Sequence, residues 1–229
     1  MFDVSAARGF GNNTLASTID DVTGRLQRLD PDTLEVTDVG PVNVPYELGD
    51  CMFTPADGKL YMVDGHGDRS LYTIDLATGA ASLIGFHGNS AMEGLAFHPP
   101  TGQIFGTSLD DASLFQLSAT TGAATLVGGV GNRFQGLAWD STRNVMTAFN
   151  GFQIFAVDVA DAGLTLLAST ESVVDDGMTY DPVIDRFWVV DFNGRVLQLD
   201  PNQGFTTTLE SFTGGHHTCI AEVPVPVGH

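Results

Sequence analysis

Short apolar segments with one aromatic side chain recur along the chain at nearly constant spacing. In each segment, apolar and small residues alternate and then run into a turn, a pattern that predicts a strand. The repeated position lies 41 to 44 residues apart from copy to copy, and the fifth copy carries a glutamate there: Phe53, Phe97, Trp139, Tyr180 and Glu222. A fixed period of this length indicates a repeat architecture.

Three further strand patterns follow each of the first four copies. Second strands are expected over residues 60–63, 104–107, 145–148 and 187–190, and third strands over residues 71–75, 114–118, 154–158 and 196–200. Fourth strands come after turn residues, for example over residues 81–85 and 124–128. Four strands in about 42 residues are typical of one blade of a β-propeller.

The two ends of the chain together complete one blade. Residues 14–18, 26–30 and 35–39 supply three strands without an inner one, and residues 217–223 supply the missing inner strand. Pairing the ends in this way leaves no open sheet edge in the ring. We therefore predict one all-β domain, a five-bladed β-propeller with four-stranded blades, closed by the C-terminal inner strand. Residues 1–12 fit no repeat position. The expected blades are 13–40 with 217–224, 49–87, 92–129, 134–170 and 175–213.

The repeat also predicts where polar side chains meet. Inner strands of a propeller line its axis, so the positions just before the repeated small residue should converge at one mouth of the channel. These positions hold Glu93, Gln135, Asp176 and Thr218, and the second blade has Gly49 with Asp50 next to it. Converging carboxylates repel one another, and a cation relieves that cost. Oxygen ligands of this kind suit Ca²⁺, so we expect Glu93, Gln135, Asp176 and Asp50 as metal ligands.

The loops of the same face add further candidates. His216 and His217 precede Thr218 directly. In a hydrolase, Asp176 or His217 would act as the base or the nucleophile, while the histidine could equally be a solvated loop residue. His66 and Asp191 lie in loops between second and third strands, and we expect them with Thr218 and His216 around a ligand. Most Asp and Asn residues in these loops are individually explained by their preference for turns.

The net charge of the protein excludes some classes of binding partner. The formal net charge is −19 with Lys59 as the only lysine, so the surface should repel phosphate backbones and anionic lipids and attract cations. No segment approaches the roughly 18 apolar residues that span a bilayer, and the N-terminus lacks the pattern of a signal peptide. We expect a monomer that binds a small molecule at the channel mouth, with no nucleic acid and no membrane span.

Two cysteines, Cys51 and Cys219, are too few for a cysteine zinc site. Both should lie on inner strands of neighbouring blades. A disulfide between them and a pair of buried thiols are both compatible with the sequence.

Three inner-strand segments resemble motifs of the gluconolactonase/regucalcin family of calcium-dependent propeller hydrolases. The segments are residues 93–97, 135–139 and 176–180, beginning Glu-Gly, Gln-Gly and Asp-Gly. The resemblance implies Glu93, Gln135 and Asp176 as Ca²⁺ ligands. That family has six blades, however, and has asparagine where this chain has Gln135. Residues 221–226 also resemble the junction before a bacterial sorting tail of the PEP-CTERM type, which implies an extracellular or periplasmic protein.

Three functions remain open at this point. The first is a Ca²⁺-dependent hydrolase of a lactone, ester or phosphotriester, in which the ion polarises the reacting oxygen. The second is a non-catalytic propeller that binds a carbohydrate or another ligand with a structural cation, and the third is a scaffold or designed propeller. Glu93 and Asp176 could also serve as the paired carboxylates of a glycosidase. No serine nucleophile elbow, phosphate-binding loop or zinc signature is present in the sequence.

Overall fold

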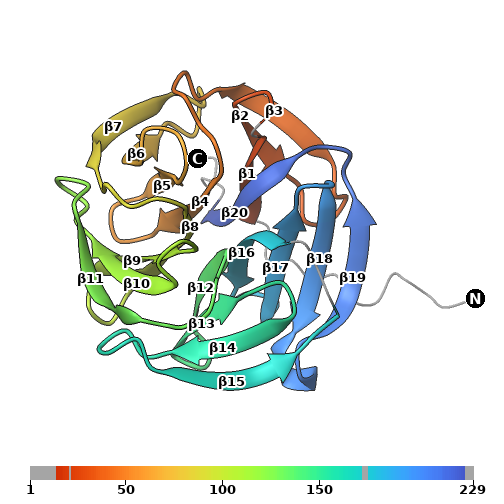
Figure 1. The fold of residues 1–229 in the computed structure, drawn as a ribbon. Coiled ribbons are helices and arrows are strands. Elements are labelled where there is room, and N and C mark those ends of the chain that lie inside the picture. Colours follow the sequence, from red (N-terminus) through yellow and green to blue (C-terminus); the bar gives the residue numbers. More distant parts are fainter. Residues whose placement is uncertain (1–13, 21, 172–174, 225–229) are drawn as a thin grey trace, which may run out of the picture.

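The described part of the chain forms five antiparallel sheets of four strands, arranged around a common axis (Figure 1). The structure is a computed structural model that describes residues 14–20, 22–171 and 175–224. The prediction of an all-β, five-bladed β-propeller is confirmed. Helix is confined, within these ranges, to a single 3-10 turn, Pro201–Gln203. No described helix is long and apolar enough to cross a membrane.

The strands follow one order in every blade, from the axis outward. Blade 1 holds β20 (His217–Pro224), β1 (Thr14–Asp20), β2 (Arg25–Leu29) and β3 (Val36–Pro41), and blade 2 holds β4 (Gly49–Thr54), β5 (Lys59–Asp64), β6 (Ser70–Ile74) and β7 (Ala81–Phe86). Blade 3 holds β8 (Met92–His98), β9 (Gln103–Ser108), β10 (Ser113–Leu117) and β11 (Ala124–Gly129). Blade 4 holds β12 (Gly136–Asp140), β13 (Val145–Phe149), β14 (Gln153–Val157) and β15 (Leu164–Ser169). Blade 5 holds β16 (Asp175–Asp181), β17 (Arg186–Asp191), β18 (Arg195–Asp200) and β19 (Thr206–Phe212).

Position in the blade decides how apolar a strand is. Strands in the middle of a blade pack on neighbouring blades with both faces, so β5 is buried at every position after Lys59. The outermost strands have exposed faces, and the same exposed and half-buried positions recur in β7 and β11. The core is therefore a set of layers between blades, which explains the near-continuous apolar runs of the middle strands.

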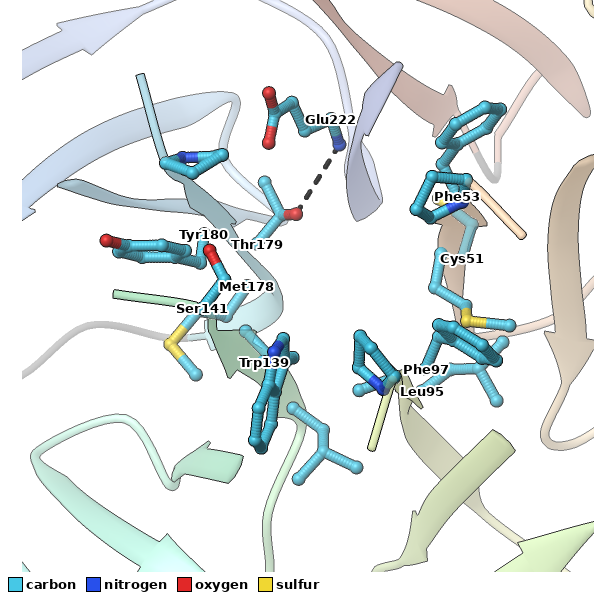
Figure 2. A pocket seen from close by; sticks show the side chains of 17 residues that line it. Cys51, Phe53, Leu95, Phe97, Trp139, Ser141, Met178, Thr179, Tyr180 and Glu222 are labelled. Atoms are coloured by element: carbon cyan, nitrogen blue, oxygen red, sulfur yellow. Dashed lines mark hydrogen bonds between the residues drawn. The ribbon is translucent and has the colours of Figure 1, made fainter. Parts of the chain in front are cut away.

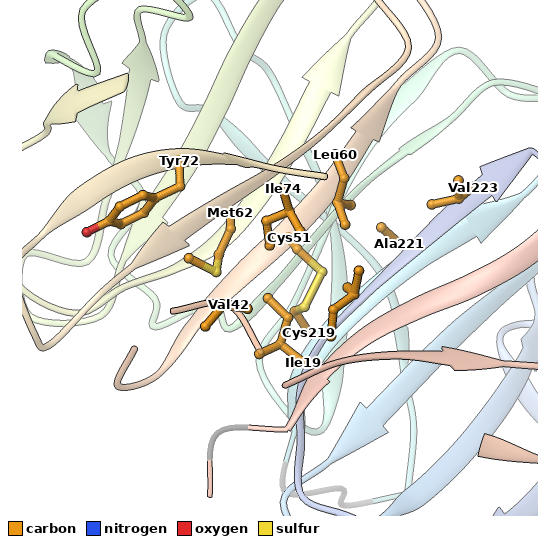
Figure 3. Close-up of a cluster of buried hydrophobic side chains, with 11 residues drawn as sticks. Ile19, Val42, Cys51, Leu60, Met62, Tyr72, Ile74, Cys219, Ala221 and Val223 are labelled. Atoms are coloured by element: carbon orange, nitrogen blue, oxygen red, sulfur yellow. A yellow bond between two sulfur atoms is a disulfide. The ribbon is translucent and has the colours of Figure 1, made fainter. Parts of the chain in front are cut away.

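Blade 1 closes the ring as predicted. β20 pairs antiparallel with β1, with Leu15 opposite Val223 and Ser17 opposite Ala221. A disulfide joins Cys219 of β20 to Cys51 of β4, with the two Cα atoms 5.3 Å apart (Figure 3). The bond crosses from blade 1 to blade 2 and lies in an apolar cluster, so the last strand is held both by its own sheet and by its neighbour.

The repeated small residue marks a close approach of the inner strands. A Cβ atom at Gly177 would lie 2.8 Å from the Cα atom of Cys219, and one at Gly94 would lie 3.2 Å from the Cβ atom of Leu137. The register of two inner strands shifts just before these glycines, between Met92 and Gly94 in β8 and between Asp175 and Gly177 in β16. Such bulges re-aim one side chain, which in β8 is that of Glu93.

Candidate functional site

The channel has two mouths with different chemistry. We call the end where the inner strands begin the upper mouth, and the end where they finish the lower mouth. Most predicted site residues belong to the upper mouth. Gly49 pairs with Asp64 and Gly136 with Phe149, so the loops between second and third strands lie at this same end.

The structure brings three predicted residues of the upper mouth together. Nε2 of His66, in the loop after β5, lies 2.9 Å from Oε1 of Glu93 on β8. The side-chain amide of Gln135, just before β12, donates to the same carboxylate. Burial raises the pKa of Glu93, which is 5% exposed, while the contacts with His66 and Gln135 oppose that rise. Blades 2, 3 and 4 thus share one buried carboxylate.

Asp50 and Thr218 both form hydrogen bonds with the backbone of neighbouring strands. The carboxylate of Asp50 accepts the amide hydrogens of Leu95 and Cys51, each at 2.8 Å, and the side chain is fully buried. The hydroxyl of Thr218 lies 2.9 Å from the Tyr46 hydroxyl and donates to the carbonyl of Ile19. The amides that Asp50 accepts lie on the inner strands β4 and β8, which have one unpaired edge each. The carbonyl that Thr218 reaches lies on β1, where the register with β20 shifts between Thr18 and Asp20.

His217, His216 and Asp191 lie on blades 5 and 1. His217 is fully buried, its Nε2 contacts the Thr213 hydroxyl, and burial lowers its pKa against the opposing charges of Asp20 and Asp191. Asp191 accepts the amide hydrogens of Asn193 and Arg195 and so holds the turn after β17. His216 is exposed, with its ring 6.3 Å from that of Phe192.

The side chain of Asp176 lies outside the described residues, although its backbone belongs to β16. Among the side chains that the structure does describe, only one set of three or more His, Cys, Asp or Glu residues brings its ligand atoms within 4.8 Å of one another. That set is Asp50, Cys51 and Cys219, and its two sulfur atoms already form the disulfide. Of the four expected Ca²⁺ ligands, the structure brings Glu93 and Gln135 together, whereas the carboxylate of Asp50 accepts backbone amides.

The lower mouth contains a pocket of about 290 Å³ on the axis (Figure 2). All five inner strands or the turns after them contribute to its wall, so the pocket exists only in the closed ring. Hydrocarbon makes up much of the wall, from residues such as Met52, Leu95, Ala96, Leu137, Ala138 and Met178. The turn after each inner strand forms the rim, with Pro55, Pro99, Ser141 and Pro182 at matching positions.

Among the described residues that line this pocket, Glu222 alone is charged. Its backbone amide donates to the Thr179 hydroxyl at 3.4 Å (Figure 2). Among the described residues, nothing donates a hydrogen bond to its carboxylate or forms an ion pair with it. Burial, followed by the negative charge of Asp181, raises the pKa of Glu222 to about 8.

Sequence reasoning missed the pocket, although the residue pattern contained a signal for it. The register places Glu222 opposite Ala16 just as Tyr180 stands opposite Phe187 and Trp139 opposite Met146. Glu222 therefore replaces the aromatic residue of the other four blades. A carboxylate at an otherwise aromatic position of a repeat identifies the one blade that differs chemically.

Comparison with known proteins establishes the fold alone. No family model matches the chain, and no curated protein matches it. A chain from the crystal structure of a nidogen/laminin complex superposes with a TM-score of 0.67 at 13% identity, covering 92% of this chain and 98% of that one. A protein of unknown function from Bacteroides thetaiotaomicron gives a TM-score of 0.61 at 16% identity, covering 92% of this chain and 62% of that one. At these identities both likenesses show that the chain has a β-propeller fold, and they give no support to the gluconolactonase/regucalcin family in particular.

Proposed function

We propose that the protein is a non-catalytic binding propeller that holds a small molecule with an apolar body in the pocket of the lower mouth. The pocket itself carries this proposal, because it has the volume of a small-molecule site and walls from every blade. Burial of hydrocarbon is the main source of affinity in such a site. For a ligand of about twelve heavy atoms, a typical efficiency near −0.4 kcal/mol per atom corresponds to a Kd of roughly 300 μM.

The lining favours binding over catalysis. A general acid or base needs a reacting group within hydrogen-bond reach, and a nucleophile needs a base beside it. The part of the lining that the structure describes contains a single carboxylate, from Glu222, and no histidine or lysine. Its hydroxyl groups are those of Ser141, Thr179 and Tyr180, and the Tyr180 hydroxyl donates to Asp185 away from the pocket wall.

Occlusion of the rim tests the proposal. Ser141 is exposed at the rim, so Ser141→Phe should place a ring over the mouth without entering the core. We expect the neutral dye N-phenyl-1-naphthylamine to fluoresce more strongly with the wild-type protein and to lose that response in Ser141→Phe. The matched control is Thr125→Phe, on the exposed strand β11, which should bind the dye normally.

A second variant is needed because the ring of Ser141→Phe could rotate away from the mouth of the pocket. Ala138→Leu fills the pocket from its wall and should weaken dye binding in the same way. Equal dye binding in wild type, Ser141→Phe and Ala138→Leu would contradict a ligand site at the lower mouth. An absent response in the wild type would instead favour the scaffold alternative.

A Ca²⁺-dependent hydrolase of a lactone, ester or phosphotriester at the upper mouth is the second candidate. The observation that favours it is the convergence of Gln135 and His66 on the buried carboxylate of Glu93, at a bulge in β8. Glu93, Gln135 and Asp176 would hold the ion, which would polarise the reacting oxygen. His217, with its ring on Thr213, is a weaker candidate for the base than sequence reasoning suggested.

Thermal unfolding separates this candidate from a structural cluster. A free Ca²⁺ concentration of about a hundred times the Kd would stabilise the folded protein by about 2.7 kcal/mol. The hydrolase proposal expects Ca²⁺ to raise the unfolding midpoint of the wild type, and Glu93→Gln and Asp176→Asn to abolish that rise. A midpoint that is the same in Ca²⁺ and in chelator would remove this candidate.

An extracellular or periplasmic location is part of the proposal. Its support is the Cys51–Cys219 disulfide, because such bonds persist in oxidising compartments. Alkylation of the protein in freshly lysed source cells tests it. Both cysteines should resist a thiol reagent until a reductant and denaturant are added, and immediate labelling of both in denatured, unreduced protein would contradict the location.

A further inference from the structure

We infer that the ligand of the lower mouth is an organic cation, an alkylammonium or arylalkylammonium ion whose nitrogen lies against the Glu222 carboxylate and whose apolar part lies against the inner strands. This inference rests on the proposed function and names the class of ligand for that same pocket. A small apolar pocket with one charged group selects a molecule with one charged end.

The negative charge of the pocket comes from one of the five blades. Four blades place an aromatic residue at the repeated position, and these four line the pocket: Phe53, Phe97, Trp139 and Tyr180. The fifth blade places Glu222 there, with the same register to its neighbouring strand. A ligand therefore meets negative charge from one blade and polarisable apolar surface from the rest.

The carboxylate of Glu222 lacks a counter-charge within the described residues. Asp181, on β16, is the titratable group that acts on it from the neighbouring blade, and it is negative. Thr179, the other contact on β16, is neutral and uses its hydroxyl to accept the Glu222 amide. Glu222 is partly buried, and a carboxylate in such a position with only a like charge among its described neighbours is costly. A bound cation offsets that cost.

Other ligand classes fit the wall less well. Ca²⁺ takes six to eight oxygen ligands, whereas this wall offers one carboxylate amid hydrocarbon. A carbohydrate would lose most of its hydrogen bonds to water against the same wall. Anions are opposed by Glu222 and by the net charge of −19, which attracts cations to the molecule from a distance.

An isosteric pair of ligands tests the charge directly. Benzyltrimethylammonium and neopentylbenzene have the same shape, and only the first is charged. In equilibrium dialysis against the wild type near pH 8.5, we expect the cation to bind at least about tenfold more tightly than its uncharged isostere. In Glu222→Gln the two should bind within about threefold of each other.

The pH dependence provides a second readout, since the quaternary nitrogen keeps its charge at every pH. A carboxyl group with a pKa of about 8 is mostly protonated near pH 6 and mostly ionised near pH 8.5. The affinity of the cation should therefore rise over that range, approaching the roughly tenfold preference that the ionised carboxylate provides. Glu222→Gln should show a flat profile. The control Glu35→Gln removes one exposed charge elsewhere and should behave as the wild type does.

The outcomes distinguish the inference from the proposed function. Equal affinity of wild type for the two isosteres, or an unchanged preference in Glu222→Gln, overturns the cation and leaves the pocket as a site for apolar molecules. Failure of both isosteres to bind the wild type overturns the ligand site and the inference together. Retention of the neutral isostere by Glu222→Gln shows that this variant is folded with its pocket intact.

Discussion

The two mouths of the channel are built from the same five strands. They differ in whether their carboxylates already have hydrogen-bond partners within the protein. At the upper mouth, Glu93 is matched with His66 and Gln135, and Asp50 is matched with the amide of Leu95. At the lower mouth the strands leave a hollow, and Glu222 lines it with a carboxylate that has no described partner. Polar residues gathered on an axis therefore do not by themselves make a binding site. A cavity next to a charge without a partner among the described residues is more specific evidence of a binding site.

The largest expected effect comes from the disulfide that joins the inner strands β4 and β20. Replacing Cys51 and Cys219 together by serine removes a crosslink across 168 residues, which the chain-entropy model values at about 5 kcal/mol. For a chain of this size that loss lowers the unfolding midpoint by roughly 10–20 °C. The measurement is thermal unfolding of the wild type with and without reductant beside the double variant. A midpoint insensitive to both would show that the strands alone hold the ring closed.

Glu222→Gln should change how the unfolding free energy depends on pH. The folded-state pKa of Glu222 is about 8, above its unfolded value, so the stability linked to this group is greatest at acidic pH and is lost as pH rises toward 8. We expect the variant to match the wild type near pH 4 and to exceed its unfolding free energy by about 2–4 kcal/mol near pH 8.5. Urea unfolding at both pH values measures the difference. Parallel pH profiles for the two proteins would mean that Glu222 is solvated.

Asp50→Ala tests whether the upper mouth is structural at this position. The substitution strips a buried acceptor from two backbone amides, and we expect it to cost about 2–3 kcal/mol of unfolding free energy. The loss should be the same in Ca²⁺ and in chelator, because both carboxylate oxygens are engaged by the backbone. A loss seen only in Ca²⁺ would restore Asp50 as a metal ligand.

His66→Ala should have the smallest effect. The His66 ring is partly exposed, at 37%, so its contact with Glu93 is worth under about 1 kcal/mol. Dye binding at the lower mouth should remain at the wild-type level, since this cluster lies at the other end of the strands. Weaker dye binding in this variant would show that the two mouths are coupled.

The fold could be predicted because its determinants are periodic in the sequence. The Gly positions of the inner strands, among them Gly94 and Gly177, recur because neighbouring backbones touch there, and the unmatched strands at the two ends imply ring closure. The site was less accessible to the same reasoning. Register locates Asp50 and Thr218 on the axis, but it does not show that nearby backbone groups already use their oxygens. The hollow at the lower mouth depends on how far the strands diverge, which only packing decides.

Ring closure has a consequence for how the protein is made. Ile19 and Thr218 lie in one sheet although 199 positions separate them, so the first blade waits for its inner strand until nearly the whole propeller has been synthesised. Contacts this distant in sequence form late and slowly. Until then one edge of β1 has no partner strand and is accessible to chaperones and proteases.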